Sequence, residues 1–186
     1  MATSNFVTDQ YASDAFVESC GAVVFDLSQD PIQVCLLHHL ANDEWYLAKG
    51  RRNCGESRQE AALREVLEET GFRCTLLPVD MTTRAPASDD DADAPDTAAA
   101  RQDLTEPFML TLRKIDGGAG MKLIWWYVAT LENGAATDGD AGEAQFEASF
   151  FSCEEAVEKL TFGNDRDILR KAISLVRQTG SLSVNK

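Results

Sequence analysis

The chain has 186 residues, and 44% of them are hydrophobic, which is enough to bury the core of one domain. Its formal net charge of −14 argues against a general nucleic-acid-binding protein, because that class carries an excess of basic residues. The five cysteines are odd in number and include no C-x-x-C pair, so the sequence favours neither a disulfide framework nor a zinc site.

The first ten residues are polar and lack the basic and then apolar pattern of a signal peptide. No apolar run approaches the roughly 18 residues that a membrane-spanning helix needs. We therefore expect a cytoplasmic protein with no membrane partner, although a nuclear location or unconventional export would leave the same sequence pattern.

Three apolar runs predict three strands in the first fifty residues. They cover residues 15–25, 32–38 and 45–48, and a turn at residues 28–31 separates the first two. Residues 49–56, which include two glycines, are expected to form a flexible loop.

The clearest predicted helix follows at residues 57–70. Ser57 and Glu60 have the spacing of a capping box, and Gly71 stands where a left-handed residue commonly ends a helix. Residues 72–79 then return to a strand pattern.

Residues 81 to about 106 are low in complexity and acidic. Eight acids and two arginines lie between Asp80 and Glu106, which accounts for six of the fourteen net negative charges. Such a segment buries too little apolar surface to offset its ordering entropy. We expect a disordered or loosely packed loop within a single domain that spans residues 1–186; the functional alternative is an acidic lid or a tail for a partner protein.

The second half predicts three more strands and two helices. Strands are expected at residues 108–115, 121–131 and 146–151, with a loop at 136–142 before the last. Trp125, Trp126 and Tyr127 alternate faces of the second of these strands, so core packing is favoured over base stacking for each.

The two helices have recognisable starts. Ser152 and Glu155 form a second capping box for a short helix that ends near Leu160, and Asn164 is expected to cap the final helix. Strands on both sides of a central helix, followed by helices, predict an α/β or α+β sandwich.

The chemistry is concentrated in residues 50–72, which read GRRNCGESRQEAALREVLEETGF. Glu65, Glu68 and Glu69 stand at i, i+3 and i+4, so their carboxylates share one helical face and repel one another. A divalent cation removes that repulsion, and hard oxygen ligands suit Mg²⁺ or Mn²⁺. A solvated acidic face is the alternative for such a cluster taken alone, but the surrounding glycines and arginine favour a metal site.

Three further residues of this stretch have distinct expected roles. Gly50 lacks a Cβ, which helps a backbone carbonyl to approach a metal. Glu56 and Arg64 are expected to hold the loop to the helix through charge-assisted hydrogen bonds.

Residues 50–72 match the Nudix box at every defined position, so the sequence resembles the Nudix hydrolase superfamily. The resemblance implies a mixed sheet between helices, an α/β/α sandwich whose box forms a loop–helix–loop. It implies Mg²⁺ or Mn²⁺ held by Glu65, Glu69 and the Gly50 carbonyl, with Glu68 in the same acidic set as the general base. In some relatives a glutamate from a later loop is the base, and Glu143 and Glu147 are the candidates here.

The stretch LAKGRRNCGE resembles the branch that contains diadenosine and diphosphoinositol polyphosphate hydrolases, whose equivalent stretch commonly reads P-K-G; Ala48 replaces that proline. The segment LTFGNDRDILRKAI is similar to fungal members of this group. The resemblance implies a phosphoanhydride hydrolase acting on a polyphosphorylated small molecule, either a diphosphoinositol polyphosphate or a dinucleoside polyphosphate.

Basic residues near the box are the candidates for binding that substrate. The set expected to grip the phosphates is Lys49, Arg51, Arg52, Arg113 and Lys122. Lys114, His38 and His39 are weaker additions to it. Surface solubility is the alternative role for each of these side chains.

Two other functions fit the same family resemblance. Hydrolysis of mRNA caps requires a basic RNA path, which the acidic composition hardly provides. A non-catalytic Nudix-fold binding module usually has substituted glutamates in the box, whereas all of them are present here. Sanitation of oxidised nucleoside triphosphates is a further, weaker option.

Overall fold

The computed structural model describes residues 5–86, 96–132 and 143–183. Within them lies an eight-stranded mixed sheet in the order β10-β2-β1-β9-β5, with β3 on β2, β4 on β1 and β8 on β9. Its strands are β1 (Phe16–Asp26), β2 (Gln33–His39), β3 (Glu44–Tyr46), β4 (Lys49–Arg51), β5 (Cys74–Leu76), β8 (Met109–Ile115), β9 (Gly120–Leu131) and β10 (Phe146–Ser152). Strands β1 and β9 are parallel, and the other pairs are antiparallel.

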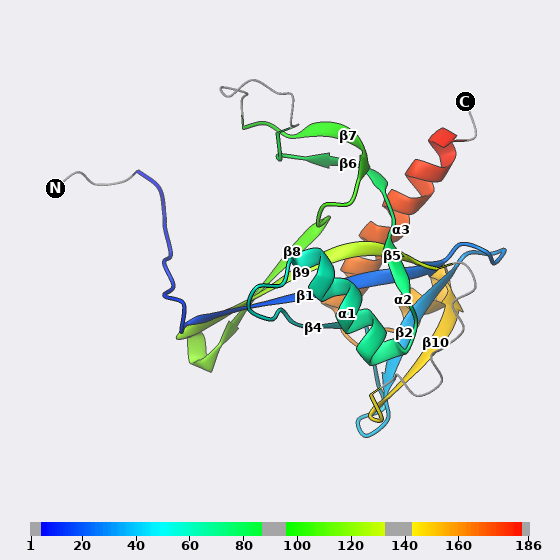
Figure 1. Cartoon of the computed structure of the whole chain (residues 1–186), viewed down its shortest axis with the longest axis horizontal. Coiled ribbons are helices and arrows are strands. Elements are labelled where there is room, and N and C mark those ends of the chain that lie inside the picture. The colour runs from blue at the N-terminus through cyan, green and yellow to red at the C-terminus, as the bar shows by residue number, and fades with distance from the viewer. Residues whose placement is uncertain (1–4, 87–95, 133–142, 184–186) are drawn as a thin grey trace.

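Helices cover both faces of this sheet (Figure 1). The helix α1 (Arg58–Thr70) packs on one face, and α2 (Cys153–Lys159) and α3 (Gly163–Ser183) pack on the other. A short 3-10 turn, Asp116–Gly118, joins β8 to β9. The expected α/β sandwich with a mixed sheet is therefore confirmed.

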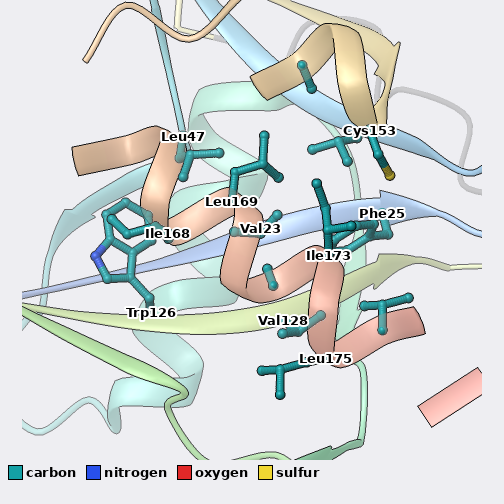
Figure 2. Close-up of a cluster of buried hydrophobic side chains, with 14 of the residues drawn as sticks. Val23, Phe25, Leu47, Trp126, Val128, Cys153, Ile168, Leu169, Ile173 and Leu175 are labelled. Carbon is teal, nitrogen blue, oxygen red and sulfur yellow. The ribbon is translucent and has the colours of Figure 1, made fainter. Parts of the chain in front are cut away.

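Strand β1 explains the two cores, because its successive side chains point to opposite faces. Val23 and Phe25 pack with Trp126 and with the α3 residues Ile168 and Leu169, as Figure 2 shows. On the other face Cys20, Ala22 and Val24 pack with Ala61, Ala62 and Val66 of α1. Burial on both faces accounts for the nearly continuous apolar run of β1.

The predicted loop at residues 49–56 is wrong in its first three residues, which form β4. Arg51, Gly50 and Lys49 pair with Ser19, Cys20 and Gly21 of β1. Three residues are too few for a period-2 pattern, so their strand character depends on a partner thirty residues away.

The predicted strand at residues 72–79 divides into β5 and β6 (Val79–Thr83). Pro78 lies between them and has no N–H for a ladder. Strand β6 leaves the main sheet and pairs with β7 (Ala99–Leu104) in a separate two-stranded sheet, which projects from the body in Figure 1.

This ribbon corrects the expected loose segment at residues 81–106. Its flanks are paired, Val79 with Leu104 and Met81 with Arg101, and Val79 and Met81 are buried in the α3 core. The Asp80 N–H also donates to Thr179 Oγ1 at 2.8 Å. The few apolar residues at the flanks thus suffice to anchor them. The acidic stretch 87–95 lies outside the described residues, as does the whole of the expected loop at 136–142.

The C-terminal helices follow the expected pattern with one shift. The Ser152–Glu155 capping box is present. The last helix begins at Gly163, so Asn164 lies inside its first turn instead of capping it. In the ranges described, no helix is both long and apolar enough to span a bilayer.

Candidate active site

The helix that carries the acidic cluster is fixed at both ends by its own sequence. Ser57 Oγ accepts from the Glu60 N–H, and the Glu60 carboxylate accepts from the Ser57 N–H at 2.8 Å. Gly71 ends the helix with φ 76°, a left-handed value that glycine adopts without strain. The predicted capping box and helix end are confirmed, so the register of the three glutamates is set locally.

Arg64 fastens the preceding loop to this helix. Its Nε and Nη2 donate to the two carboxylate oxygens of Glu56 at 2.7 and 3.0 Å, and Nη2 also donates to the Arg51 carbonyl at 2.9 Å. The bidentate bond from Arg64 lowers the pKa of Glu56, and the same bond raises the pKa of Arg64. The structural role expected for this pair is confirmed.

Glu65 and Glu68 share the remaining nitrogen of Arg64. Nη1 donates to Glu65 Oε1 and to Glu68 Oε2, both at 2.8 Å. Glu65 is 8% exposed, whereas the side chain of Glu68 is half-exposed at 50%. One guanidinium thus holds two of the three acids side by side, one inside the protein and one at its surface.

Gly50 leaves room for the Glu65 carboxylate. A Cβ on Gly50 would lie 1.7 Å from Glu65 Oε2 and 2.0 Å from Cδ, far inside contact distance. The glycine was expected for the approach of its carbonyl to a metal; the structure adds that the β4 backbone and the Glu65 carboxylate pack directly together.

Glu69 is bound by the backbone of β4. Its Oε2 accepts from the Lys49 N–H at 2.8 Å. Burial raises the pKa of Glu69 to about 7, against the opposing effect of Lys49, and the charges of Glu65 and Glu143 add to the rise. Burial also raises the pKa of Glu65, with Arg64 opposing and Glu68 and Glu143 contributing. The acids therefore form one coupled group of like charges.

This group suits a divalent cation. Each described bond uses one carboxylate oxygen, namely Glu65 Oε1, Glu68 Oε2 and Glu69 Oε2. The other oxygen of each has no hydrogen-bond partner among the residues that the structure describes. Oxygen-only donors fit Mg²⁺ or Mn²⁺, and a cation reverses the rise in pKa that burial and like charge impose. Over the same residues no three acids, histidines or cysteines stand in positions that could hold an ion without side-chain movement, and Arg64 pairs with both Glu65 and Glu68.

Of the two later glutamates, Glu143 lies beside the cluster. Its N–H donates to the Glu68 carbonyl at 3.0 Å, and its charge contributes to the pKa of both Glu65 and Glu69. Glu147 instead stands opposite His38 in the ladder between β10 and β2.

Four of the five expected basic residues gather next to the acids. Lys122 is partly buried, and burial lowers its pKa, with further lowering by Lys49, Arg113 and Arg51. Glu65 opposes that shift. Strands β4, β8 and β9 supply these side chains, and Arg113 pairs directly with Lys122. We call Lys49, Arg51, Arg113 and Lys122 the basic cluster.

Arg52 is held elsewhere. Its Nε donates to Glu18 Oε2 at 2.9 Å and its Nη1 to the Glu56 carbonyl at 2.7 Å. Glu18, which the sequence analysis did not single out, also accepts from Arg58 and from Trp125 Nε1, and Arg58 lies 4.1 Å over the Trp125 ring. The contacts of Arg52 therefore hold the loop in place. Its partner Glu18 lies 34 residues away in the chain, so no local sequence pattern predicts this pair.

The two histidines among the weaker additions contact residues outside the basic cluster. His38 stacks on Trp45 with ring centroids 4.4 Å apart, and its Nε2 is 2.7 Å from Asp43 Oδ1. His39 packs edge-on against Tyr46 and Phe146.

The three aromatic residues of β9 alternate faces as expected. Trp126 is 1% exposed in the α3 core and Tyr127 is buried on the α1 side, while Trp125 is partly exposed beneath Arg58.

Another residue that the sequence analysis missed is Asp165, in the first turn of α3. It is 8% exposed, and Lys49 and Arg113 act on its pKa, which burial raises. An acid in a first helical turn is common, so only the tertiary structure distinguishes it from a solvated one.

The chain is similar to a known protein family and to solved structures. The family model of the NUDIX domain matches residues 17–172. A NUDIX hydrolase from Nitrosomonas europaea is similar in structure with a TM-score of 0.57 and 16% identity, over 85% of this chain and 88% of that one. An Ap4A hydrolase from C. elegans has a TM-score of 0.56 and 17% identity, over 87% of this chain and 98% of that one. At such identities these structures share the fold alone.

A curated relative matches in sequence over a shorter stretch. It is a putative 8-oxo-dGTP diphosphatase from Bacillus subtilis (strain 168), 43% identical over 56 residues. The match covers 30% of this chain and 37% of the length of that relative.

Proposed function

The chain belongs to the NUDIX domain family, and from that premise we propose that it is a metal-dependent pyrophosphohydrolase that cleaves a phosphoanhydride bond in a small polyphosphorylated substrate. The observation that carries the proposal is the juxtaposition of two opposite clusters. Three carboxylates of α1 stand beside the four side chains of the basic cluster, and the charge of Glu65 contributes to the pKa of Lys122. Carboxylates alone suit a metal cation, and basic side chains alone suit an anion. Together they suit a metal cation and a polyphosphate.

Glu65, Glu69 and the Gly50 carbonyl are the proposed ligands of Mg²⁺ or Mn²⁺, with Glu68 in the same acidic set. When bound, such an ion polarises phosphoryl oxygens, acidifies a water molecule and neutralises the leaving phosphate. Arg64 keeps Glu65 and Glu68 on one side of the helix, so that the ion meets an ordered set of oxygens instead of dispersed side chains.

Glu68 is the proposed general base. Its side chain is half-exposed, and Arg64 holds only one of its two carboxylate oxygens. Glu143 is the alternative base, because its N–H donates to the Glu68 carbonyl and its charge contributes to the pKa of Glu65 and Glu69. Glu147 has less support, because it lies on β10 opposite His38 of β2.

The basic cluster is the proposed phosphate-binding surface. Lys122 has a lowered pKa because it is partly buried among three other cations, and a bound polyphosphate would relieve that repulsion. Arg52 is left out of this surface, since Glu18 and a backbone carbonyl engage its guanidinium.

The proposed substrates are diphosphoinositol polyphosphates, dinucleoside polyphosphates, or both. The stretch LAKGRRNCGE supports this branch, and the structurally similar Ap4A hydrolase is consistent with the dinucleotide member of the pair. Cap hydrolysis has less support, because a chain of net charge −14 offers little basic surface for an RNA path. A binding module without catalysis has less still, since Glu65, Glu68 and Glu69 are all present and adjacent.

A substrate panel tests the proposal. Purified protein is assayed with Mg²⁺ and with Mn²⁺ on inositol pyrophosphates, dinucleoside polyphosphates, nucleotide sugars and capped RNA, with phosphate or nucleotide release as the readout. Glu69→Gln is expected to lower kcat by at least about a hundredfold. Glu158→Gln, a change of an exposed acid on α2, is the matched control and is expected to leave the rate unchanged.

The two candidate bases are separated by Glu68→Gln and Glu143→Gln. The base is the residue whose loss removes the acidic limb of the pH–rate profile, whereas loss of a neighbour shifts that limb. Turnover of no substrate in the panel, or full activity of Glu69→Gln, would contradict the proposed hydrolase.

A further inference from the structure

One end of the main sheet has an apolar face that none of the described helices covers. Strands β1, β9 and β8 lie side by side there, and residues that stand opposite each other share a face, such as Phe16 with Met121 and Leu123 with Leu112. Phe16, Leu110 and Leu112 are 41%, 40% and 60% exposed, while Met121 and Leu123 are partly buried. We call these five residues the apolar face.

Helix α1 ends its cover of this side of the sheet at its first residue, Arg58. The guanidinium of Arg58 lies 4.1 Å from the centre of the Trp125 ring, and Trp125 stands opposite Leu110 in the ladder between β9 and β8. The basic cluster lies on the other side of the same strands, because Arg113 follows Leu112 directly in β8 and successive side chains point to opposite faces. The apolar face is therefore separate from the proposed catalytic site.

The apolar face borders an open sheet edge. Strand β8 pairs with β9 on one side, and on its other side no strand of the described residues pairs with it. Every second N–H and C=O group of β8 therefore points away from the sheet, which makes the edge a template for another strand. Lys114 lies on the same side of β8 as Leu112, and it forms no ion pair with a described residue. The edge thus offers backbone hydrogen-bonding groups, exposed leucines and a positive charge.

The N-terminal arm, residues 5–15, has the complementary properties. It forms no helix or strand, and Figure 1 shows it running away from the body at the start of β1. Phe6 and Val7 are 82% and 102% exposed, and the arm contains Asp9 and Asp14 but no lysine or arginine. Of the eight large apolar side chains that are exposed among the described residues, five lie on the arm or on the apolar face. The two surfaces therefore hold most of the exposed apolar side chains that an interface could bury.

The arm of the same chain is poorly placed to cover its own β8. Strand β9 lies between β1 and β8, so the arm leaves the sheet on the far side of β9 from the open edge. The arm of a second copy has no such constraint. Two copies that exchange arms form a closed pair with two equal contacts, related by twofold symmetry.

Direct pairing of β8 with β8 of a second copy has less support. It would place Arg113 and Lys114 of both copies on one short edge, and like charges oppose such pairing. The arm brings Asp9 instead, whose charge is opposite to that of Lys114. Charge complementarity therefore favours the arm as the strand that occupies the edge.

We propose that the chain forms a dimer in which the N-terminal arm of each copy adds as a strand to β8 of the other copy and covers its apolar face. The added strand supplies hydrogen bonds to the open edge, Phe6 and Val7 supply apolar contacts, and Asp9 pairs with Lys114. The interface uses none of the proposed catalytic residues, so it stands independently of the proposed hydrolase.

Sedimentation velocity of the whole chain over a range of concentrations tests the proposal. The wild-type chain is expected to dimerise with a dissociation constant in the micromolar range, which suits a small interface. Val7→Ser and Leu112→Ser should each raise that constant at least about tenfold. Leu27→Ser changes a leucine that is 42% exposed in the turn after β1; it is the matched control and should leave the constant unchanged.

A charge exchange between two variants tests whether the arm acts on a second copy. Asp9→Lys sets two lysines against each other and Lys114→Glu sets two acids against each other, so each variant alone should dimerise at least about tenfold more weakly. Mixing the two should restore dimers to within about threefold of the wild-type constant, because each arm then meets an opposite charge on the other copy. In the control mixture Lys171→Glu, which changes an exposed lysine on α3, replaces Lys114→Glu and should leave Asp9→Lys weakly associated.

Three results would overturn the proposal. The first is a wild-type chain that stays monomeric at every concentration. The second is a dimer that Leu112→Ser weakens and the arm variants do not, because that result assigns the edge to pairing of β8 with β8. The third is a mixture of Asp9→Lys and Lys114→Glu that associates no better than either variant alone. Asp9 and Lys114 are both exposed, and circular dichroism of each variant checks that the fold is kept.

Discussion

Replacing Gly50 by alanine should separate the folding of this protein from its activity. The new Cβ would lie 1.7 Å from Glu65 Oε2, whereas ordinary contact begins at 3.4 Å, so the carboxylate must retreat by about 1.7 Å. Gly50 has no positive φ, so alanine fits the backbone. The three atoms nearest to the new Cβ all belong to the far end of one side chain, that of Glu65.

The expected loss of stability follows from the hydrogen bond that this displacement of the Glu65 carboxylate breaks. Glu65 leaves Arg64 Nη1, a bond of 2.8 Å, which should cost about 1 to 3 kcal/mol of the free energy of unfolding. A displacement of about 1 Å in an ordered site costs about a hundredfold in rate, so kcat should fall at least that far. Activity is thus expected to collapse while the chain stays folded.

The assay combines steady-state turnover, Mn²⁺ binding by electron paramagnetic resonance and urea unfolding. Gly180→Ala is the matched control, because no atom lies within 4 Å of its Cβ position and alanine favours the helix. It should keep full activity and unfold at equal or higher urea. Wild-type turnover and Mn²⁺ affinity in Gly50→Ala would refute the assignment of Glu65 as a ligand.

Three further predictions test the surroundings of the site. In EDTA the pKa of Glu69 in the folded chain is about 7, above its ordinary value of 4.5, so the native state holds this proton more tightly than the unfolded state does. The protonated Glu69 therefore stabilises the fold at low pH. This contribution to the free energy of unfolding falls by at most about 3 kcal/mol as the pH rises from about 4.5 to 7. Urea unfolding of wild type and Glu69→Gln between pH 5 and 8 should show that slope in the wild type alone; parallel curves would refute it. Lysine in place of Arg64 cannot make the guanidinium hydrogen bonds to Glu56, Glu65 and Glu68, so Arg64→Lys should lower the free energy of unfolding by about 2 kcal/mol. Urea midpoints measure this loss, and an unchanged midpoint would mean that these hydrogen bonds contribute nothing to stability. Ser57→Ala removes the cap of α1 and should cost about 1 kcal/mol with an unchanged m-value, and a loss below about 0.3 kcal/mol would count against the capping box.

The acidic flank shows where the sequence misled. Low complexity predicts a loose segment across residues 81–106, but Met81 and Leu104 lie near its ends and engage the α3 side of the fold. The average composition of a segment hides such isolated apolar residues, but each of them can still pack against the core and order the chain around it. The pairing of β6 with β7 across more than a dozen intervening residues has no local signal at all.

The basic residues show a second limit. Composition and proximity to the box favoured Arg52 as much as Arg51, yet Arg52 is bound by Glu18, and the basic cluster is completed by Arg113 and Lys122 from β8 and β9. Which cation faces the acids depends on strand order and register. A one-residue change of register would turn these side chains to the other face of the sheet.

The sequence by itself determined the helix of the box, its two ends and the alignment of Glu65, Glu68 and Glu69, because those features depend on bonds within a single helix and its caps. It also determined the family and the α/β class. Only the tertiary structure decided that Glu143 lies beside Glu68 while Glu147 does not, and that Asp165 is buried near Lys49. These neighbours are more than seventy residues apart in the chain, and their contact exists only once the sheet has fixed the relative positions of α1, β4 and α3.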